Sequence, residues 1–535
     1  MDAALLSSTP RRAGPRQWTG LAILALPTLL LSLDVTVLFL ALPHLSADLG
    51  VTSTQSLWIM DIYGFLIAGC LITMGTVGDR IGRRRLLLIG GAAFGAASVL
   101  AAYATTPELL IATRALLGVA GATLMPSTLA LIMNMFPDPR QRGTAIGIWV
   151  SCFSLGIAIG PVLGGLMLEY FWWGSVFLLA VPVMVLLLVL GPVLLPESRG
   201  EGGRLDLPSV ALSIAAMIPV IYGIKDLAKN GFSVLGIASA VVGVGIGWAF
   251  VKRQLGLEHP LLDLRLFATR RFTAALVIVL FGLLAIGGVY LFVTQYLQLV
   301  HGLSPLGAGL WLLPAALSMV VSSMVAPALA QRIRPGVVVG AGLFVSAAGF
   351  LTLARVPVDG LPLLVFGFTL VYLGIGPMMA LGSDLIVGSA PPESAGSAAA
   401  VGETGMEIGI ALGIATFGSF GTAVYQSQVL GEEFAQAPAA VVEAARDSLA
   451  AGVSTAADLP GAAALLAPAR EAFTDAFNAV SLAGGLLVAL LAVGAFVALR
   501  EVQPPGEAHD AGEAHDAGEA HDPAKDSSAS LTASA

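Results

Sequence analysis

Long, nearly uncharged apolar runs fill most of this chain, and short polar or Pro- and Gly-rich breaks separate them. A helix needs about 20 mostly apolar residues to cross a bilayer. A transmembrane β-barrel would instead alternate apolar and polar residues. The pattern therefore predicts an all-α polytopic membrane protein. Its fourteen expected spans lie near 18–43, 54–77, 86–104, 108–131, 143–168, 174–195, 207–224, 232–251, 272–299, 305–330, 336–354, 361–388, 396–424 and 474–499.

Composition excludes the soluble classes of protein. Of 535 residues, 57% are apolar and 11% are charged, whereas a soluble domain carries roughly 25% charged residues. Too little polar side chain is present to coat several soluble domains, so a soluble enzyme is excluded, and the same apolar excess excludes disorder for most of the chain. The net charge of −8 is concentrated in the acidic C-terminal tail. No basic surface remains for a nucleic-acid partner.

The basic residues predict the orientation in the membrane. With the N-terminus in the cytoplasm, most Arg and Lys residues fall in cytoplasmic segments, including the cluster Arg83 to Arg85. This bias follows the positive-inside rule and places both termini in the cytoplasm. Cys70 and Cys152 lie inside apolar runs, where we interpret them as packing residues.

A few charged residues fall inside the expected spans: Asp34, Asp61, Arg114, Asp384, Glu403 and Glu407. A charge at the bilayer centre costs roughly 2.5–3.5 kcal/mol on insertion scales, so each is a functional candidate. Glu403 and Glu407 are four residues apart and share one helix face, and two nearby carboxylates resist joint ionisation. A membrane carboxylate can hold a proton or attract a cation, and one group can therefore exchange the two. We interpret Arg114 as a partner for an acid rather than as a substrate ligand.

The loop after the second span combines an acid, glycines and a basic cluster. Glycine permits tight backbone approach in a short loop, and Asp79 can pair with an Arg or cap a neighbouring helix. We expect the contacts of this loop to hold two helices together on the cytoplasmic side. These contacts should break when the protein changes conformation. Its key residues are Gly75, Asp79, Arg80, Gly82, Arg83 and Arg84.

The fifth span carries small residues at helical spacing and a proline. Glycines four residues apart make a smooth face for close helix contact, and Pro161 favours a bend because it removes a backbone hydrogen bond. The residues of this pattern are Gly156, Gly160, Pro161, Gly164 and Gly165.

These motifs carry a resemblance. The loop from Gly75 to Arg84 resembles the signature of the major facilitator superfamily, and Gly156 to Gly165 resembles the antiporter motif of its drug exporters. The sequence around Asp34, LDVTVLFLALP, resembles the first helix of the fourteen-helix drug/proton antiporters, and the likeness covers almost the whole chain. Within that family the chain is most similar to the Qac-type exporters of quaternary ammonium compounds.

The resemblance implies a twelve-helix core of two six-helix halves with two inserted helices, in a bacterial cytoplasmic membrane. It also implies that Asp34, Asp61, Glu403 and Glu407 are coupling or cation-binding carboxylates. The chain departs from the Qac-type pattern at Gly402, where an acid is usual, and at Ser318, where an Asp is usual. These departures favour monovalent over divalent cations as substrates.

The implied organisation divides the chain as follows: a cytoplasmic N-terminus 1–17, an N-terminal half 18–200, two inserted helices 201–255, a C-terminal half 256–500 with a partly helical outside loop 425–473, and a disordered cytoplasmic tail 501–535 with GEAHDA repeats. The tail histidines His509, His515 and His521 are a candidate metal site. The simpler interpretation, which we favour, is a solvated tail.

The cavity of such a protein should be apolar and aromatic, because aromatic faces attract organic cations and Met adapts to varied shapes. The candidates for its lining are Trp58, Tyr63, Phe153, Tyr290, Phe292, Gln295, Tyr296 and Met406.

The leading hypothesis is a monomeric, proton-driven exporter of lipophilic cationic drugs that uses the proton gradient and needs no cofactor or metal. A second hypothesis is a dedicated exporter of one endogenous antibiotic, in which the acids serve only protons. A third is a non-transporting membrane receptor that acts through the 425–473 loop or the tail. An enzyme is not expected, because the chain has no nucleophile elbow, phosphate-binding loop or His/Cys metal spacing.

Overall fold

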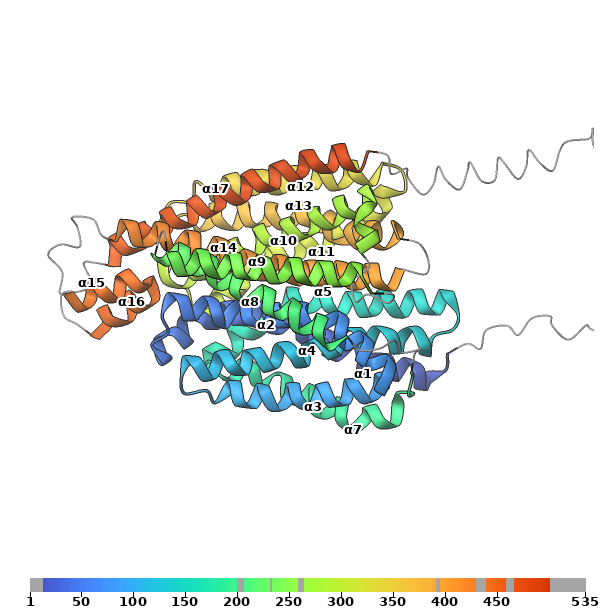
Figure 1. The fold of residues 1–535 in the computed structure, drawn as a ribbon. Helices are drawn as coiled ribbons and strands as arrows, with labels where there is room; N and C mark the ends of the chain where they lie inside the picture. Colours follow the sequence, from blue (N-terminus) through green and yellow to red (C-terminus); the bar gives the residue numbers. More distant parts are fainter. Residues whose placement is uncertain are drawn as a thin grey trace, which may run out of the picture.

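The computed structural model describes residues 13–199, 206–230, 233–257, 264–390, 395–429, 439–458 and 466–500. Regular structure in these ranges is helical, and the long helices run side by side (Figure 1). The start of α1 and the end of α17 lie at one end of the bundle, while α15 and α16 lie at the opposite end. We call the end that carries α15 and α16 the outer end, following the expected orientation.

The N-terminal half contains helices up to α7, in which α6 and α7 together form one span. Its core pairs are α1 with α5, α2 with α4, and α3 with α4 and α7. The bounds are α1 Pro15–Leu49, α2 Ser53–Ile81, α3 Arg83–Ala102, α4 Pro107–Met135, α5 Pro139–Tyr170, α6 Ser175–Leu178 and α7 Ala180–Leu194.

The C-terminal half repeats this arrangement, with α10 against α14, α11 against α13, and α12 against α13 and α17. A π-helical turn, η2, continues α10. The bounds are η1 Leu264–Ala268, α10 Arg270–Gln295, η2 Tyr296–Val300, α11 Pro305–Ala330, α12 Pro335–Leu353, α13 Leu361–Gly388, α14 Ala395–Gln428 and α17 Leu466–Ala498.

Helices α8, Leu207–Asn230, and α9, Val234–Leu255, form a hairpin that packs on the seam between the two halves. α8 contacts both α2 and α14, where Phe65, Ile221 and Ala415 form a small apolar core. The opposite surface of α9 exposes large apolar side chains such as Val244 and Trp248. That exposure suits contact with lipid.

Thirteen of the described helices are long and apolar enough to cross a membrane, and they coincide with thirteen of the fourteen expected spans. The remaining expected span, 207–224, corresponds to the shorter apolar helix Pro208–Gly223. Helices continue into both ends of the expected outside segment 425–473, because α14 extends to Gln428 and α17 begins at Leu466. Between them lie α15, Ala439–Asp447, and α16, Leu449–Asp458. The tail repeats and their histidines lie outside the described residues.

The glycines of α5 let it approach α1 at backbone distance. A methyl group added at Gly156 would lie 2.4 Å from the Leu29 carbonyl oxygen, and one added at Gly160 would lie 2.0 Å from Thr36 Oγ1. Gly164 faces Val37 in the same way. The motif therefore fixes α1, and with it Asp34, against α5.

The two halves meet closely at the outer end. A Cβ added at Gly309 of α11 would lie 2.2 Å from the Pro161 carbonyl oxygen of α5, and one at Gly165 would lie 2.6 Å from the Pro305 carbonyl oxygen. Gln298 Nε2 also donates a 3.1 Å hydrogen bond to the Leu40 carbonyl oxygen of α1. The structure is therefore sealed across the halves at this end.

We predict that Gly309→Ala destabilises this sealed state. The added methyl has no space beside the Pro161 carbonyl, and overpacking costs about 1–3 kcal/mol. The melting temperature of the purified protein should fall by several degrees. Gly245→Ala on α9, where nothing lies within 4 Å, is the matched control and should leave the melting temperature unchanged. Equal melting temperatures for both variants would contradict the tight outer contact.

Candidate functional site

A central cavity lies between the two halves. Side chains from α1, α2, α5, α10, α13 and α14 form most of its wall, and Met125 of α4 and Met319 of α11 complete it. The wall is mainly apolar and aromatic, with Ser32, Thr36 and a few tyrosine hydroxyls as its neutral polar groups.

Two carboxylates line this apolar space. Glu403 and Glu407 both belong to α14 and both line the cavity, as their spacing predicts. Met406 lies between them in sequence and also lines it. α14 approaches α2 closely here, since a Cβ at Gly64 would lie 3.2 Å from the Ala411 methyl.

The buried base of the N-terminal half is paired with an acid. Arg114 of α4 is 1% exposed, and its Nη1 lies 2.6 Å from Asp34 Oδ2 of α1. Arg114 Nε donates a 3.2 Å hydrogen bond to the Ile59 carbonyl oxygen of α2, and its guanidinium lies 4.4 Å from the centre of the Tyr63 ring. These contacts join α1, α2 and α4 and engage the guanidinium away from the central cavity.

A smaller cavity links the ion pair to the acid pair. Arg114 and Glu407 both line it, and Tyr63, Val35, Phe39 and Ile410 line both it and the central cavity. The Tyr63 hydroxyl is buried and has no hydrogen-bond partner among the described residues. Tyr63 and Glu407 therefore border both cavities, whereas Arg114 borders only the smaller one.

Asp61 and Asp384 are placed apart from the acid pair. Asp61 of α2 is fully buried, but it lines neither the central nor the smaller cavity. Asp384 is exposed near the inner end of α13 and lines neither cavity. The structure thus brings Glu403, Glu407 and the Asp34–Arg114 pair to one region and leaves Asp384 outside it.

Four of the predicted lining residues reach the central cavity: Tyr63, Phe153, Tyr290 and Met406. Sequence reasoning missed other aromatic residues of the wall, above all Phe39 and Tyr372. The Phe39 and Tyr290 rings meet edge to face at 4.7 Å, and the Tyr290 and Tyr372 rings lie 6.4 Å apart. Phe39 lies five residues after Asp34, within the same motif. That position was the one sequence signal that could have identified it as a cavity residue.

The other four candidates do not line the central cavity in this structure. Trp58 packs on the small core beneath α8. Tyr296 points toward α17, where its ring lies 5.8 Å from Phe477 and its hydroxyl donates to the carbonyl oxygen of Val358 at 2.7 Å. Phe292 and Gln295 line a separate cavity at the outer end. These four side chains leave their helices on another face, or at another depth, than the side chains that line the central cavity.

The motif loop is tied to the end of α7. Arg83 donates to Asp79 Oδ1 from Nε at 2.8 Å, and its backbone N–H donates to the Ser198 carbonyl oxygen at 2.8 Å. Glu197 Oε1 accepts the Arg84 backbone N–H at 3.1 Å. Glu197 was not found from the sequence, because it lies far from the motif in the chain.

Gly82 makes this loop possible. Its φ of 111° is one that L side chains rarely adopt, and a Cβ there would lie 2.4 Å from Glu197 Oε1. Gly75 has open space around it, and Arg80 is exposed. The latch therefore rests on Asp79, Gly82, Arg83 and Arg84.

We predict strong coupling between Asp34 and Arg114 in stability. Removing one partner of a buried pair leaves an uncompensated charge and costs about 3–5 kcal/mol. Asp34→Asn and Arg114→Gln should each lower the melting temperature, and the double variant should recover part of the loss. Arg253→Gln removes the Asp206 pair, whose Arg is 39% exposed, and should cost about 1 kcal/mol or less. Additive effects of the two buried substitutions would contradict the pairing.

Comparison with known proteins identifies the family. The profile of the Major Facilitator Superfamily matches residues 24–414. The multidrug efflux pump LfrA of Mycolicibacterium smegmatis is 42% identical over 497 residues, which cover 91% of this chain and 97% of that protein. The methyl viologen resistance protein SmvA of Salmonella typhimurium is 35% identical, covering 91% of this chain and 99% of its own. The puromycin resistance protein pur8 of Streptomyces alboniger is 34% identical, covering 80% and 86%.

Solved structures agree on the fold. A bacterial homologue of the human lysosomal transporter Spinster, in an inward-facing and unoccupied conformation, matches with a TM-score of 0.64 at 17% identity and covers 92% of this chain and 98% of that one. The chain belongs to the major facilitator superfamily, and its predicted fold class is confirmed. It is a multi-pass membrane transporter of the multidrug efflux type, which sets aside the receptor hypothesis.

Proposed function

We propose that this member of the major facilitator superfamily exports lipophilic, mostly monovalent cations in exchange for protons. The observation that carries the proposal is the placement of Glu403 and Glu407 in an apolar, aromatic cavity between the two halves. Arg114 is engaged by Asp34 at 2.6 Å, so it does not neutralise them. The acids are therefore available to a proton or to an organic cation.

The exchange follows from the cost of charge in this cavity. An unpaired carboxylate is disfavoured in apolar surroundings, so in the absence of substrate a proton occupies the site. A lipophilic cation replaces the proton's charge and adds contacts with the Tyr290 and Phe39 rings. A proton that arrives from outside then neutralises the carboxylate and releases the cation outward. A membrane potential of 100 mV supplies about 2.3 kcal/mol per charge moved, and one pH unit supplies about 1.4 kcal/mol.

The Asp34–Arg114 pair acts as a second proton-responsive group in this proposal. It lies behind Tyr63, which borders the same small cavity as Glu407. Protonation of Asp34 would release the guanidinium and loosen α1 from α4. A change at the Asp34–Arg114 pair would therefore alter the wall of the cation site, because Tyr63 packs on Arg114.

The names of the relatives support a cationic substrate class. Methyl viologen, which the Salmonella relative's name gives, is an aromatic dication, and aromatic cations suit a wall of rings with carboxylates. This name supports an aromatic cationic substrate class and does not support the preference for monovalent cations. We further propose a monomer in the bacterial cytoplasmic membrane, with both termini in the cytoplasm, that needs no cofactor beyond the proton gradient.

A second candidate is a dedicated exporter of one endogenous compound. Other relatives are named the tetracenomycin C resistance and export protein of Streptomyces glaucescens, 33% identical, and a probable actinorhodin transporter of Streptomyces coelicolor, 30% identical. In that case the carboxylates would serve protons alone.

The test is ethidium efflux from energised cells, with and without a protonophore. We expect efflux in the wild type that stops with the protonophore, because the proton gradient drives it. Asp34→Asn and Glu407→Gln should each reduce efflux at least tenfold, whereas Glu169→Gln, exposed at the outer end of α5, should retain it.

Surface labelling or immunoblotting must show each variant in the membrane at a similar amount. Efflux that persists in Glu407→Gln would remove this residue from the cation site. Wild-type cells without protonophore-sensitive efflux of any tested cation would contradict the broad-cation proposal and favour the dedicated exporter.

A further inference from the structure

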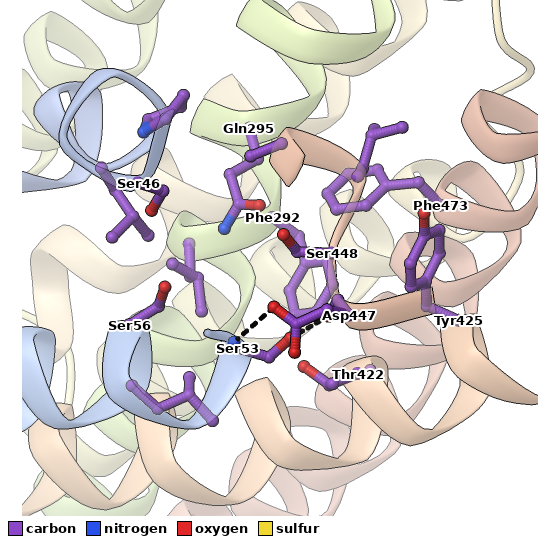
Figure 2. A pocket seen from close by; sticks show the side chains of 17 residues that line it. Ser46, Ser53, Ser56, Phe292, Gln295, Thr422, Tyr425, Asp447, Ser448 and Phe473 are labelled. Atoms are coloured by element: carbon purple, nitrogen blue, oxygen red, sulfur yellow. Dashed lines mark hydrogen bonds between the residues drawn. The ribbon is translucent and has the colours of Figure 1, made fainter. Parts of the chain in front are cut away.

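A second cavity lies at the outer end, and its lining side chains are drawn in Figure 2. It shares no lining residue with the central cavity. Its wall comes from the outer ends of α1, α2, α10, α14 and α17, and residues 447–450 of the hairpin complete it. Along α10, Tyr290 lines the central cavity and Leu291 and Phe292 line the outer one, so the two cavities lie in succession.

Three aromatic rings from three helices form one side of this outer cavity. The rings of Phe292 of α10 and Phe473 of α17 lie 5.5 Å apart, and the Tyr425 ring of α14 meets Phe473 edge to face at 6.3 Å. Gly421 makes room for this cluster, because a Cβ there would lie 2.2 Å from the Phe292 ring. Clustered aromatic faces of this kind suit a quaternary ammonium group.

The cluster contains a polar group without a partner. Tyr425 is 3% exposed, and its hydroxyl makes no hydrogen bond among the described residues. An unpaired buried hydroxyl is costly, so a ligand or a water that it can contact would stabilise it. The hydroxyl oxygen carries a partial negative charge, which again favours a cation.

A carboxylate lines the same cavity as the rings. Asp447, the last residue of α15, accepts a 3.2 Å hydrogen bond through Oδ2 from the backbone N–H of Ser53, the first residue of α2. The Ser53 hydroxyl donates to the Asp447 carbonyl oxygen. Figure 2 shows Asp447 between Ser53 and Thr422. The helix N-terminus thus fixes the carboxylate in place.

We propose that this outer cavity is an exit subsite for the cationic head group of the exported compound. A cation released from Glu403 and Glu407 would next meet Asp447 and the Phe292, Tyr425 and Phe473 rings before it leaves. The inference rests on the proposed function and adds a second binding position to it. Phe292 and Gln295, which do not serve the central cavity, are assigned to this subsite.

The experiment is protection of an introduced cysteine in the full chain in cells. Thr422→Cys places a thiol in the outer cavity, and a membrane-impermeant maleimide added outside should label it. Benzyltrimethylammonium, a small aromatic quaternary cation, should slow this labelling. The Glu407→Gln background separates this effect from occupation of the central carboxylate site, and sodium chloride at equal ionic strength controls for screening.

Two matched pairs of variants sharpen the result. Ser427→Cys lies exposed near the outer end of α14 and outside the cavity, so benzyltrimethylammonium should not slow its labelling. Asp447→Asn should raise the concentration needed for protection of Thr422→Cys on the order of tenfold. Glu443→Gln, exposed on the same helix, should leave that concentration unchanged.

Labelling of Thr422→Cys that benzyltrimethylammonium does not slow would overturn the subsite. The subsite would also be overturned if the Thr422→Cys variant is not labelled while the Ser427→Cys variant is. Ser46→Cys on α1, which also lines the cavity, replaces Thr422→Cys if the latter does not reach the membrane. Absence of protonophore-sensitive efflux of any tested cation in the wild type would overturn the proposed function itself. Efflux without protection would overturn the outer subsite alone.

Discussion

The cost of holding charge away from water governs this molecule. Glu403 and Glu407 face an apolar cavity whose described lining residues include no Arg or Lys, whereas Asp34 has Arg114 at 2.6 Å. Burial disfavours an unpaired carboxylate strongly and a paired one less. The two kinds of acid are therefore suited to different tasks. We propose that the acids of the central cavity exchange a proton for a cation, and that the paired acid transmits protonation to the contacts among α1, α2 and α4.

Close backbone packing allows these acids to act through the fold. Small residues on α5 bring it against α1 at Gly156 and Gly160 and against α11 near Gly165. In the proposed cycle α5 moves with α1 as part of one half, so a change at the acids would break the contact of α5 with α11 of the other half. At the opposite end, Gly82 and Glu197 bind the motif loop to the segment after α7. The cavity thus lies between two contact regions, one at each end.

Much of the architecture follows from the sequence, because apolar runs of membrane length have few alternatives in a bilayer. The spacing of Glu403 and Glu407 predicts that both lie on one helix face, and in the structure both line the cavity. The sequence does not show which face of each helix packs against which distant helix. Trp58 and Phe292 therefore appeared equivalent to Tyr63 and Tyr290, although packing sends them to other sites. Glu197 and Asp447 act through partners more than 100 residues away in the chain, which no local pattern reveals.

The central claim is that one group of carboxylates holds either a proton or a lipophilic cation. Proton release on binding tests it directly. Purified protein in weakly buffered solution would be mixed with tetraphenylphosphonium while a pH indicator and bound cation are followed together. We predict release of about one proton per bound cation near neutral pH, and little release in Glu407→Gln, because exchange at the carboxylate requires it. Tight binding by the wild type without any proton release would contradict the account.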